Sequence, residues 1–336
     1  MKQFFVICFL FTALSATAQP EQVKKLYDQT KKWMTEGEYE SAALGFKELL
    51  QKDGNNLDVL KDWVYFNLLT KNYTKAIEVG KVMIERPDAD EQTYQLLGMG
   101  YKAIRDFENC EKAYQRGFRR FPKSGVLYNE YGEMYAIENN FSNAIIQWEK
   151  GIEAEPNYSS NYYNATMYYS KMNTNAFKML LYGELFCNLE SYTVRTADVK
   201  EILFDAWQNF LIQKLKLPAD NASAFEKAFA EAFSNIIATA QQGSSIPEIL
   251  TAARTKFLLI WFSKKQDNKF PFYLFNHLQY FLQEGMFDAY NQWLFGPVAS
   301  TAAYQIWLDT HDVEAKKFKE FQQTRLFKMP FGQYYK

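Results

Sequence analysis

A period of 34 residues in the first half of the chain constrains its fold more than any other feature. Residues 91–124 and 125–158 align without a gap. The matching positions are Tyr94, Leu97, Gly98, Tyr101, Phe107, Cys110, Tyr114 and Pro122 in the first segment, and Tyr128, Tyr131, Gly132, Tyr135, Phe141, Ala144, Trp148 and Pro156 in the second. Spacings of three and four place the aromatic residues on one helix face, and the proline ends the second helix. Each segment therefore predicts two helices, and a period of this length is typical of a stacked array.

Weaker copies of the pattern cover residues 23–56, 57–90 and 159–191. The positions that they retain are Trp33, Gly37, Tyr39, Ala42 and Phe46, then Trp63, Tyr73, Ala76 and Pro87, and finally Tyr162, Tyr169, Tyr182 and Leu185. The last copy lacks the glycine, the small alanine and the closing proline. We therefore predict five repeats within residues 21–191, of which the fifth is degenerate.

This pattern resembles the tetratricopeptide repeat (TPR), and the resemblance covers about 170 residues. It implies an all-α fold: an α-solenoid of about five helical hairpins, wound as a right-handed superhelix, with the first helix of each pair on the concave surface. It also implies that Gly98 and Gly132 let paired helices approach closely, facing small residues at Cys110 and Ala144. A small buried position suits a free thiol, so we expect Cys110 and Cys187 to be unpaired.

The resemblance further implies a groove that binds another protein or a peptide segment. In the family, ligands contact first-helix residues that do not pack between repeats. The corresponding residues are Lys24, Tyr27, Lys31, Asp58, Lys61, Tyr65, Gln92, Gln95, Met99, Lys102, Val126, Asn129, Glu133, Ser160, Tyr163 and Met167. They do not reproduce the paired Lys and Asn clamp with which some members hold a terminal carboxylate. Tyr27, Tyr65 and Tyr163 are the candidate anchors; the alternative is that they pack against neighbouring helices or face water.

The first 18 residues predict a secretory signal peptide. Lys2 precedes an apolar run from Phe4 to Leu14, which is too short for a bilayer that needs about 20 residues. Ala16, Thr17 and Ala18 supply small residues for cleavage after Ala18. The alternative is an uncleaved N-terminal helix. We expect a periplasmic or secreted protein without a transmembrane segment, from a Gram-negative bacterium.

After residue 191 the period ends and the aromatic residue type changes. Residues 21–191 contain 16 Tyr and 8 Phe, whereas residues 192–336 contain 7 Tyr and 17 Phe. We therefore predict a domain boundary here and a Phe-rich, all-helical domain over residues 192–336, with the Phe stripe in its core. The apolar tail, residues 327–336, is predicted to cap the last hairpin, with docking on a partner as the alternative.

Composition and motifs narrow the function. Lys and Arg number 38 against 39 Asp and Glu, so no basic excess favours nucleic acid. Two His and three Cys are too few for most zinc sites, and the common catalytic motifs are absent. We expect no cofactor, no metal and no enzymatic activity. The alternative is an enzyme with an unrecognised catalytic site in the C-terminal domain. The leading hypothesis is a protein-binding scaffold of the cell envelope. The alternative is an accessory protein that binds a glycan or other small apolar ligand in the C-terminal domain.

Overall fold

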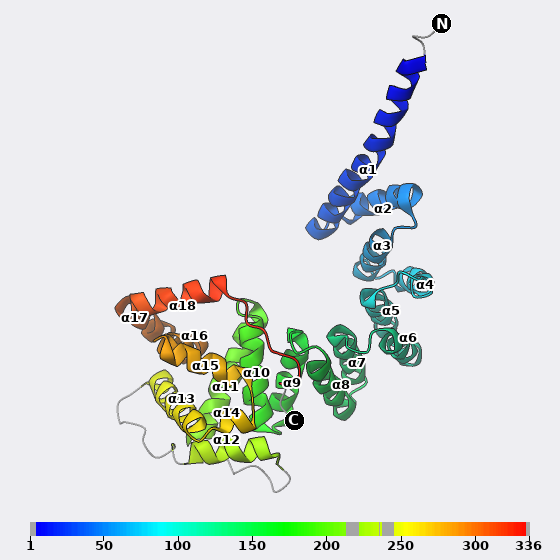
Figure 1. Ribbon diagram of the computed structural model, residues 1–336. Helices are drawn as coiled ribbons and strands as arrows, with labels where there is room; N and C mark the ends of the chain where they lie inside the picture. Colours follow the sequence, from blue (N-terminus) through cyan, green and yellow to red (C-terminus); the bar gives the residue numbers. More distant parts are fainter. Residues whose placement is uncertain (1–4, 213–221, 235, 237–244, 334–336) are drawn as a thin grey trace. The chain divides into compact units, whose positions relative to one another are not determined.

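The computed structural model describes residues 5–212, 222–234, 236 and 245–333, and every regular element in these ranges is a helix (Figure 1). The prediction of an all-α fold is confirmed. The chain divides into two compact units, Met1–Pro122 (unit 1) and Lys123–Lys336 (unit 2), which are described separately.

Unit 1 contains six helices in its described part. They are α1 (Phe5–Glu36), α2 (Tyr39–Asp53), α3 (Leu57–Leu69), α4 (Tyr73–Met83), α5 (Glu91–Ala103) and α6 (Phe107–Arg120). Each odd-numbered helix pairs with the next one as a hairpin, and the first helices α1, α3 and α5 contact one another in order. Unit 1 therefore holds the first three predicted repeats. α1 continues through Pro20, and nothing in the structure tests cleavage after Ala18.

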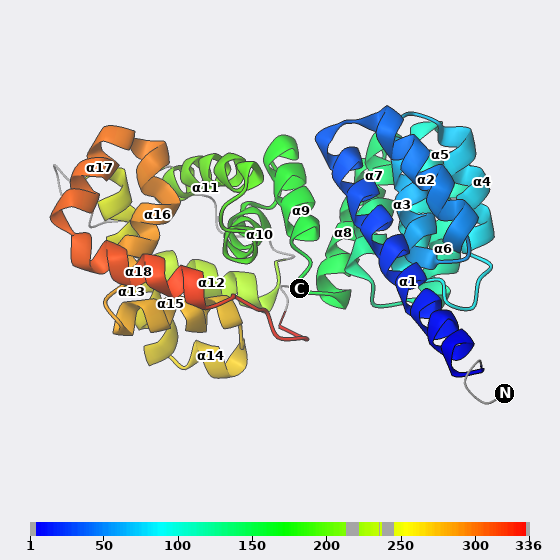
Figure 2. The same cartoon turned by 90° about the horizontal axis from the view of Figure 1, so that it is seen from above.

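Unit 2 contains the fourth and fifth repeats and, in its described part, eight further helices. The repeats are α7 (Gly125–Ile137) with α8 (Phe141–Ala154), and α9 (Ser159–Met172) with α10 (Ala176–Leu189). The later helices are α11 (Val194–Ile212), α12 (Ala224–Ser234), α13 (Ile246–Ser263), α14 (Gln266–Lys269), α15 (Tyr273–Gln283), α16 (Phe287–Ala299), α17 (Thr301–Thr310) and α18 (Asp312–Thr324). α16 is central to the later helices and contacts α11, α13, α15, α17 and α18 (Figure 2).

The 34-residue period is visible in the helix starts and in the turn inside each hairpin. α3, α5, α7 and α9 begin at residues 57, 91, 125 and 159. The turn places a residue with positive φ at the same position of every repeat, at Gly37, Lys71, Arg105, Asn139 and Asn173. Because this left-handed conformation is uncommon for side chains other than glycine, its recurrence shows that the degenerate fifth segment folds as the same hairpin.

The predicted close approach of paired helices is also confirmed. A Cβ atom added at Gly98 would lie 2.2 Å from Cζ of Tyr114, and one at Gly132 would lie 2.3 Å from Nε1 of Trp148. Cys110 donates its Sγ–H to the carbonyl of Gly98 at 3.4 Å. Cys110 and Cys187 are both buried, and no disulfide joins them.

One hydrophobic core runs through unit 2, from Ala144 in α8 to Met329 beyond α18. The predicted Phe stripe belongs to it, since Phe229 and Phe233 are almost fully buried. The domain boundary predicted between residues 191 and 192 lies inside unit 2 and stays a prediction. Within the described ranges, no helix is long and apolar enough to cross a bilayer.

The tail was predicted to cap the last hairpin. It instead continues to the turn between α8 and α9. Met329 donates its N–H to Oδ1 of Asn157 at 2.8 Å, and Nδ2 of Asn157 donates to the Met329 carbonyl at 3.0 Å. Met329 is buried there. The two hydrogen bonds between the Met329 backbone and the Asn157 side chain hold the tail in this position, and an apolar sequence pattern does not predict them. Residues 334–336 of the predicted tail lie outside the described residues.

Candidate functional site

Two of the predicted groove residues in α1 hold a carboxylate of the next repeat instead of facing free space. Tyr27 donates its hydroxyl to Oδ2 of Asp62 at 2.5 Å, and Nζ of Lys31 lies 3.1 Å from the same oxygen. Partial burial, with the hydrogen bond to Asp62, raises the pKa of Tyr27 above its usual value. The phenol is therefore neutral, and this cluster ties the first repeat to the second.

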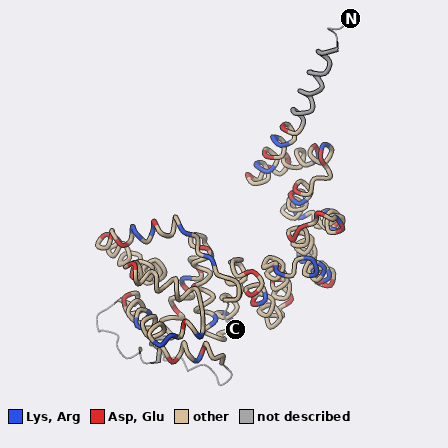
Figure 3. The backbone as a smooth tube through the Cα atoms, viewed as in Figure 1, with Lys and Arg blue, Asp and Glu red and all other residues tan. Residues whose placement is uncertain are grey.

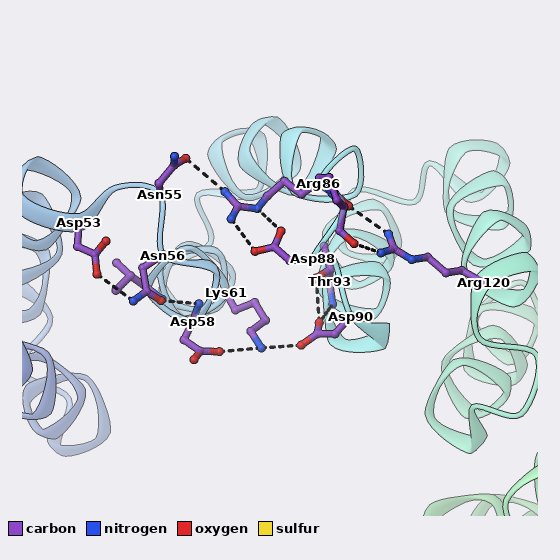
Figure 4. Close-up of polar contacts among 12 residues, drawn as sticks. Asp53, Asn55, Asn56, Asp58, Lys61, Arg86, Asp88, Asp90, Thr93 and Arg120 are labelled. Carbon is purple, nitrogen blue, oxygen red and sulfur yellow. Dashed lines mark hydrogen bonds and ion pairs between the residues drawn. The ribbon is translucent and has the colours of Figure 1, made fainter.

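Lys61 in α3 serves the same purpose between the second and third repeats (Figure 4). Its Nζ lies 2.9 Å from Asp58 and 2.7 Å from Asp90, and its side chain is only 11% exposed. Asp90 caps α5 by accepting hydrogen bonds from the backbone and hydroxyl of Thr93. Lys61 is therefore a poor candidate for contact with a partner.

Arginine side chains tie the loops at the ends of the hairpins (Figure 4). Arg86 pairs with Asp88 at 2.8 Å and reaches Asn55 in the preceding repeat. Arg120 donates to the carbonyls of Arg86 and Pro87, 34 and 33 residues earlier. These contacts join the loops of successive repeats, so the arginine side chains serve the packing of the repeats.

Tyr65 is the predicted groove tyrosine of unit 1 that stays accessible. Tyr65 is 40% exposed, and Leu69, one turn later on the same face of α3, is 39% exposed. Met99 occupies the position equivalent to Tyr65 on α5, where it packs against the core beside Val64 and Leu96. Gln92 is exposed, and Gln95 and Lys102 are partly buried. We define the Tyr65 face by residues of two adjacent first helices: Tyr65 and Leu69 of α3, and Gln92 and Met99 of α5.

A shallow pocket of about 490 Å³ lies at the other end of the predicted groove residues in this unit. Lys24, Tyr27 and Asp58 line it, together with Val23 and Val59. Of these predicted groove residues, Lys24 and Asp58 are exposed, whereas Tyr27 is engaged by Asp62 and Asp58 also pairs with Lys61.

In unit 2 the predicted residues form their own contacts. Asn129 is buried, donates to Oε1 of Glu133 at 3.0 Å and accepts a hydrogen bond from Asn164 at 2.8 Å. Tyr163 packs against the core beneath the guanidinium of Arg195, whose Cζ lies 4.9 Å from the ring centroid. The remaining members, Val126, Ser160 and Met167, are partly buried.

The sequence analysis missed a buried ionic network in unit 2. Arg254 in α13 donates to the carboxylate of Glu184 in α10 and to the amide oxygen of Asn291 in α16. Tyr290 donates to Glu184 at 2.8 Å, and Asn188 donates to the Tyr290 hydroxyl at 2.8 Å. Both charged side chains are 3% exposed. One signal was present: Arg254 lies on an apolar helix face between Leu250 and Leu258, where an unpaired charge would be costly.

An aromatic groove of about 690 Å³ lies on the later helices of unit 2. Its walls carry Tyr192, Trp293, Tyr304 and Trp307, and Trp307 is held in place because its Nε1–H donates to Asp288 at 3.0 Å. In the part of the chain that the structure describes, no group of three or more His, Cys, Asp or Glu could hold a metal ion.

No family model matches the chain, and no curated protein matches it. Solved structures do. TTC0263, a thermophilic TPR protein of Thermus thermophilus, is 16% identical, with a TM-score of 0.45 over 55% of this chain and 98% of that chain. MamA is 21% identical, with a TM-score of 0.39 over 48% of this chain and 94% of that chain.

YrrB, described as a TPR protein with an unusual peptide-binding site, is 14% identical, with a TM-score of 0.37 over 55% of this chain and 98% of that chain. The prediction of TPR-type hairpins is confirmed by the helix starts and turns of this chain, which recur every 34 residues.

Proposed function

We propose that the chain is a protein-binding scaffold and that the Tyr65 face of unit 1 binds a segment of a partner protein. The observation that carries this proposal is the division among the predicted groove residues. Tyr27, Lys31 and Lys61 are occupied by contacts between repeats, whereas Tyr65 remains exposed on a first helix. A tyrosine presents a large, rigid surface with a polar tip at a low cost in side-chain entropy, which suits an interface anchor.

The rest of the surface indicates what kind of segment would bind. Leu69 adds apolar area one turn from Tyr65, Met99 adds apolar area on the adjacent helix α5, and Gln92 offers an uncharged amide there. Both signs of charge occur in each repeat, so a single-sign field does not steer binding (Figure 3). A partner segment with one or two apolar side chains fits this face better than a nucleic acid, whose binding depends on basic excess.

We further propose that the protein is exported and acts in the cell envelope of a Gram-negative bacterium. The apolar run and the small residues before Gln19 support this location. N-terminal sequencing of the protein from a periplasmic fraction should give a chain that begins at Gln19. A chain that begins at Met1 in the cytoplasmic fraction would refute the proposed location.

The Tyr65 face can be tested by introducing a photo-crosslinking amino acid at position 65. A matched control carries the same amino acid at position 44, because Leu44 is 70% exposed on the second helix α2. We expect a discrete crosslinked species from position 65 and none from position 44. Equal crosslinking from both positions, or none from position 65, would refute the role of this face.

A second candidate function is glycan binding by the aromatic groove of unit 2. The faces of Trp and Tyr rings pack well against the C–H face of a sugar ring, and Gln322, Gln323 and Lys319 add polar groups at this groove. We expect Trp307→Ala to abolish retention of the protein on an oligosaccharide column. Retention equal to that of the unmodified protein would exclude this groove.

A further inference from the structure

A second pocket in unit 2, of about 260 Å³, combines aromatic walls with a single arginine. It lies between the end of α10, helix α15, the end of α18 and the segment that follows α18. It is lined by Asn188, Ser191, Tyr273, Asn276, His277, Tyr280, Phe281, Phe321, Gln322, Arg325, Leu326 and Phe327. We call it the Arg325 pocket, because Arg325 is the one charged residue among these.

The walls of the Arg325 pocket are aromatic and held in place. The ring of Phe327 lies 5.6 Å from that of Tyr273 and 4.9 Å from that of His277, measured between centroids. Phe321 packs edge-on against the buried Phe281 at 5.1 Å. The wall that carries Phe327 is anchored two residues later by the hydrogen bonds between Met329 and Asn157. Such walls favour a flat apolar group, because little side-chain entropy is lost on binding.

Arg325 has no carboxylate partner within the described part of the chain. Its guanidinium carbon lies 5.8 Å from the ring centroid of Tyr280 and 5.5 Å from that of Phe321. These rings position the cation and leave its N–H donors without an acceptor among the described side chains. A guanidinium forms two parallel hydrogen bonds with a carboxylate, which makes a carboxylate its best-matched small ligand.

His277 and Asn276 add neutral polar groups to the same pocket. Burial lowers the pKa of His277 to about 4, so its ring is uncharged at pH 7. The described residues supply no hydrogen-bond partner for this ring or for the Asn276 side chain. Both can therefore contact a ligand. The net charge of the lining is +1 at neutral pH, from Arg325 alone.

We propose that the Arg325 pocket binds a small organic acid that carries an aromatic or similarly flat apolar group. The carboxylate pairs with Arg325, and the apolar group enters between Phe281, Phe321 and Phe327. This binding is independent of the Tyr65 face, which lies in unit 1, and shares only Gln322 with the lining of the aromatic groove.

The test uses 4-fluorophenylacetate as the acid and 4-fluorophenylacetamide as its neutral, nearly isosteric comparison. Binding of each to the full chain is measured by ¹⁹F NMR titration. We expect the acid to bind saturably and more tightly than the amide. Arg325→Gln should weaken binding of the acid about tenfold, the effect of losing one charge-assisted contact, and leave binding of the amide unchanged.

Two further variants make the result decisive. Lys328→Gln removes an exposed positive charge three residues away and should leave both affinities unchanged. Phe327→Ala removes an aromatic wall and should weaken both compounds. The proposal is overturned if the acid does not bind, if it binds no better than the amide, or if Arg325→Gln and Lys328→Gln have equal effects. Circular dichroism confirms that each variant is folded, and Arg325, being exposed, is not required for packing.

Discussion

The five repeats and the helices after residue 192 place their polar groups in different ways. In the repeats, polar contacts recur at the ends of hairpins and join residues about one repeat apart, as Tyr27 joins Asp62 and Lys61 joins Asp90. The later helices instead join the fifth repeat through an ionic pair buried in the core, where Arg254 of α13 contacts Glu184 of α10. Periodic ties let each repeat be added to the last one, whereas a buried pair fixes one unique arrangement of helices.

The change from Tyr in the repeats to Phe in the later helices follows from this difference in the placement of polar groups. The repeat tyrosines use their hydroxyls: Tyr162 donates to the Pro156 carbonyl at 3.1 Å, and Tyr169 donates to Glu149 at 2.7 Å. The later phenylalanines pack ring against ring, as Phe233 and Phe257 do at 4.4 Å. A core with few polar partners favours Phe, because a buried hydroxyl without an acceptor is costly.

The largest expected effect is in the later helices. Arg254→Ala leaves Glu184 buried without its cation, and we expect unit 2 to lose about 3–5 kcal/mol of stability. Chemical denaturation followed by tryptophan fluorescence measures this. The control is Lys264→Ala, which removes an exposed ion pair with Glu231 and should cost less than about 1 kcal/mol. Similar losses in both variants would show that the buried pair stabilises unit 2 no more than an exposed ion pair does.

A smaller effect is expected from the close helix contact of the third repeat. Gly98→Ala places a methyl group against Tyr114, and overpacking of this kind costs about 1–3 kcal/mol. A thermal melt of the chain measures the loss. The second change Tyr114→Leu should restore part of it, because it removes the ring that the methyl group meets. If the two losses simply add, the contact is not as close as described.

The next largest effect is expected from the ion pair between Lys61 and Asp90, which joins the second and third repeats. Partial burial acts to raise the pKa of Asp90, but hydrogen bonds from Lys61 and Thr93 outweigh it and lower the pKa below its usual value. A carboxyl with a lowered pKa stabilises the fold above its unfolded pKa and loses this contribution as the pH falls through its folded pKa. Asp90→Asn should therefore cost up to about 1 kcal/mol at pH 7 and nothing once the native carboxyl is protonated.

Denaturant melts of both proteins between pH 7 and pH 2 measure this difference. A difference that stayed constant over the range would show that the charge of Asp90 does not contribute.

The smallest expected effect is a gain. Lys71 adopts a left-handed conformation with φ of 61°, so Lys71→Gly should stabilise unit 1 by about 0.5–1 kcal/mol. Lys47→Gly, at an exposed position in the interior of α2, should instead destabilise it by about 1 kcal/mol. Melting temperatures of the two variants should move in opposite directions. A shift in the same direction would contradict the strain assigned to the turn.

The sequence predicted the repeats well because their signals are local. The glycine, the turn and the aromatic positions recur at a fixed spacing, and Gly98 with Tyr114 lies within one hairpin. It predicted the candidate site less well. Whether Tyr27 faces a groove or Asp62 depends on how two helices from different repeats pack, and local spacing does not encode this. The same holds for Arg254 and Glu184, which are 70 residues apart.

The central claim is that residues on one predicted groove divide into structural ties and a binding face. The most direct test compares Tyr65→Ala with Asp62→Asn, using melting temperature and affinity for the partner captured by crosslinking at position 65. We predict that Tyr65→Ala keeps the melting temperature and loses about tenfold or more in affinity, whereas Asp62→Asn lowers the melting temperature and binds normally when folded. Unchanged affinity in Tyr65→Ala, or an unchanged melting temperature in Asp62→Asn, would contradict this division.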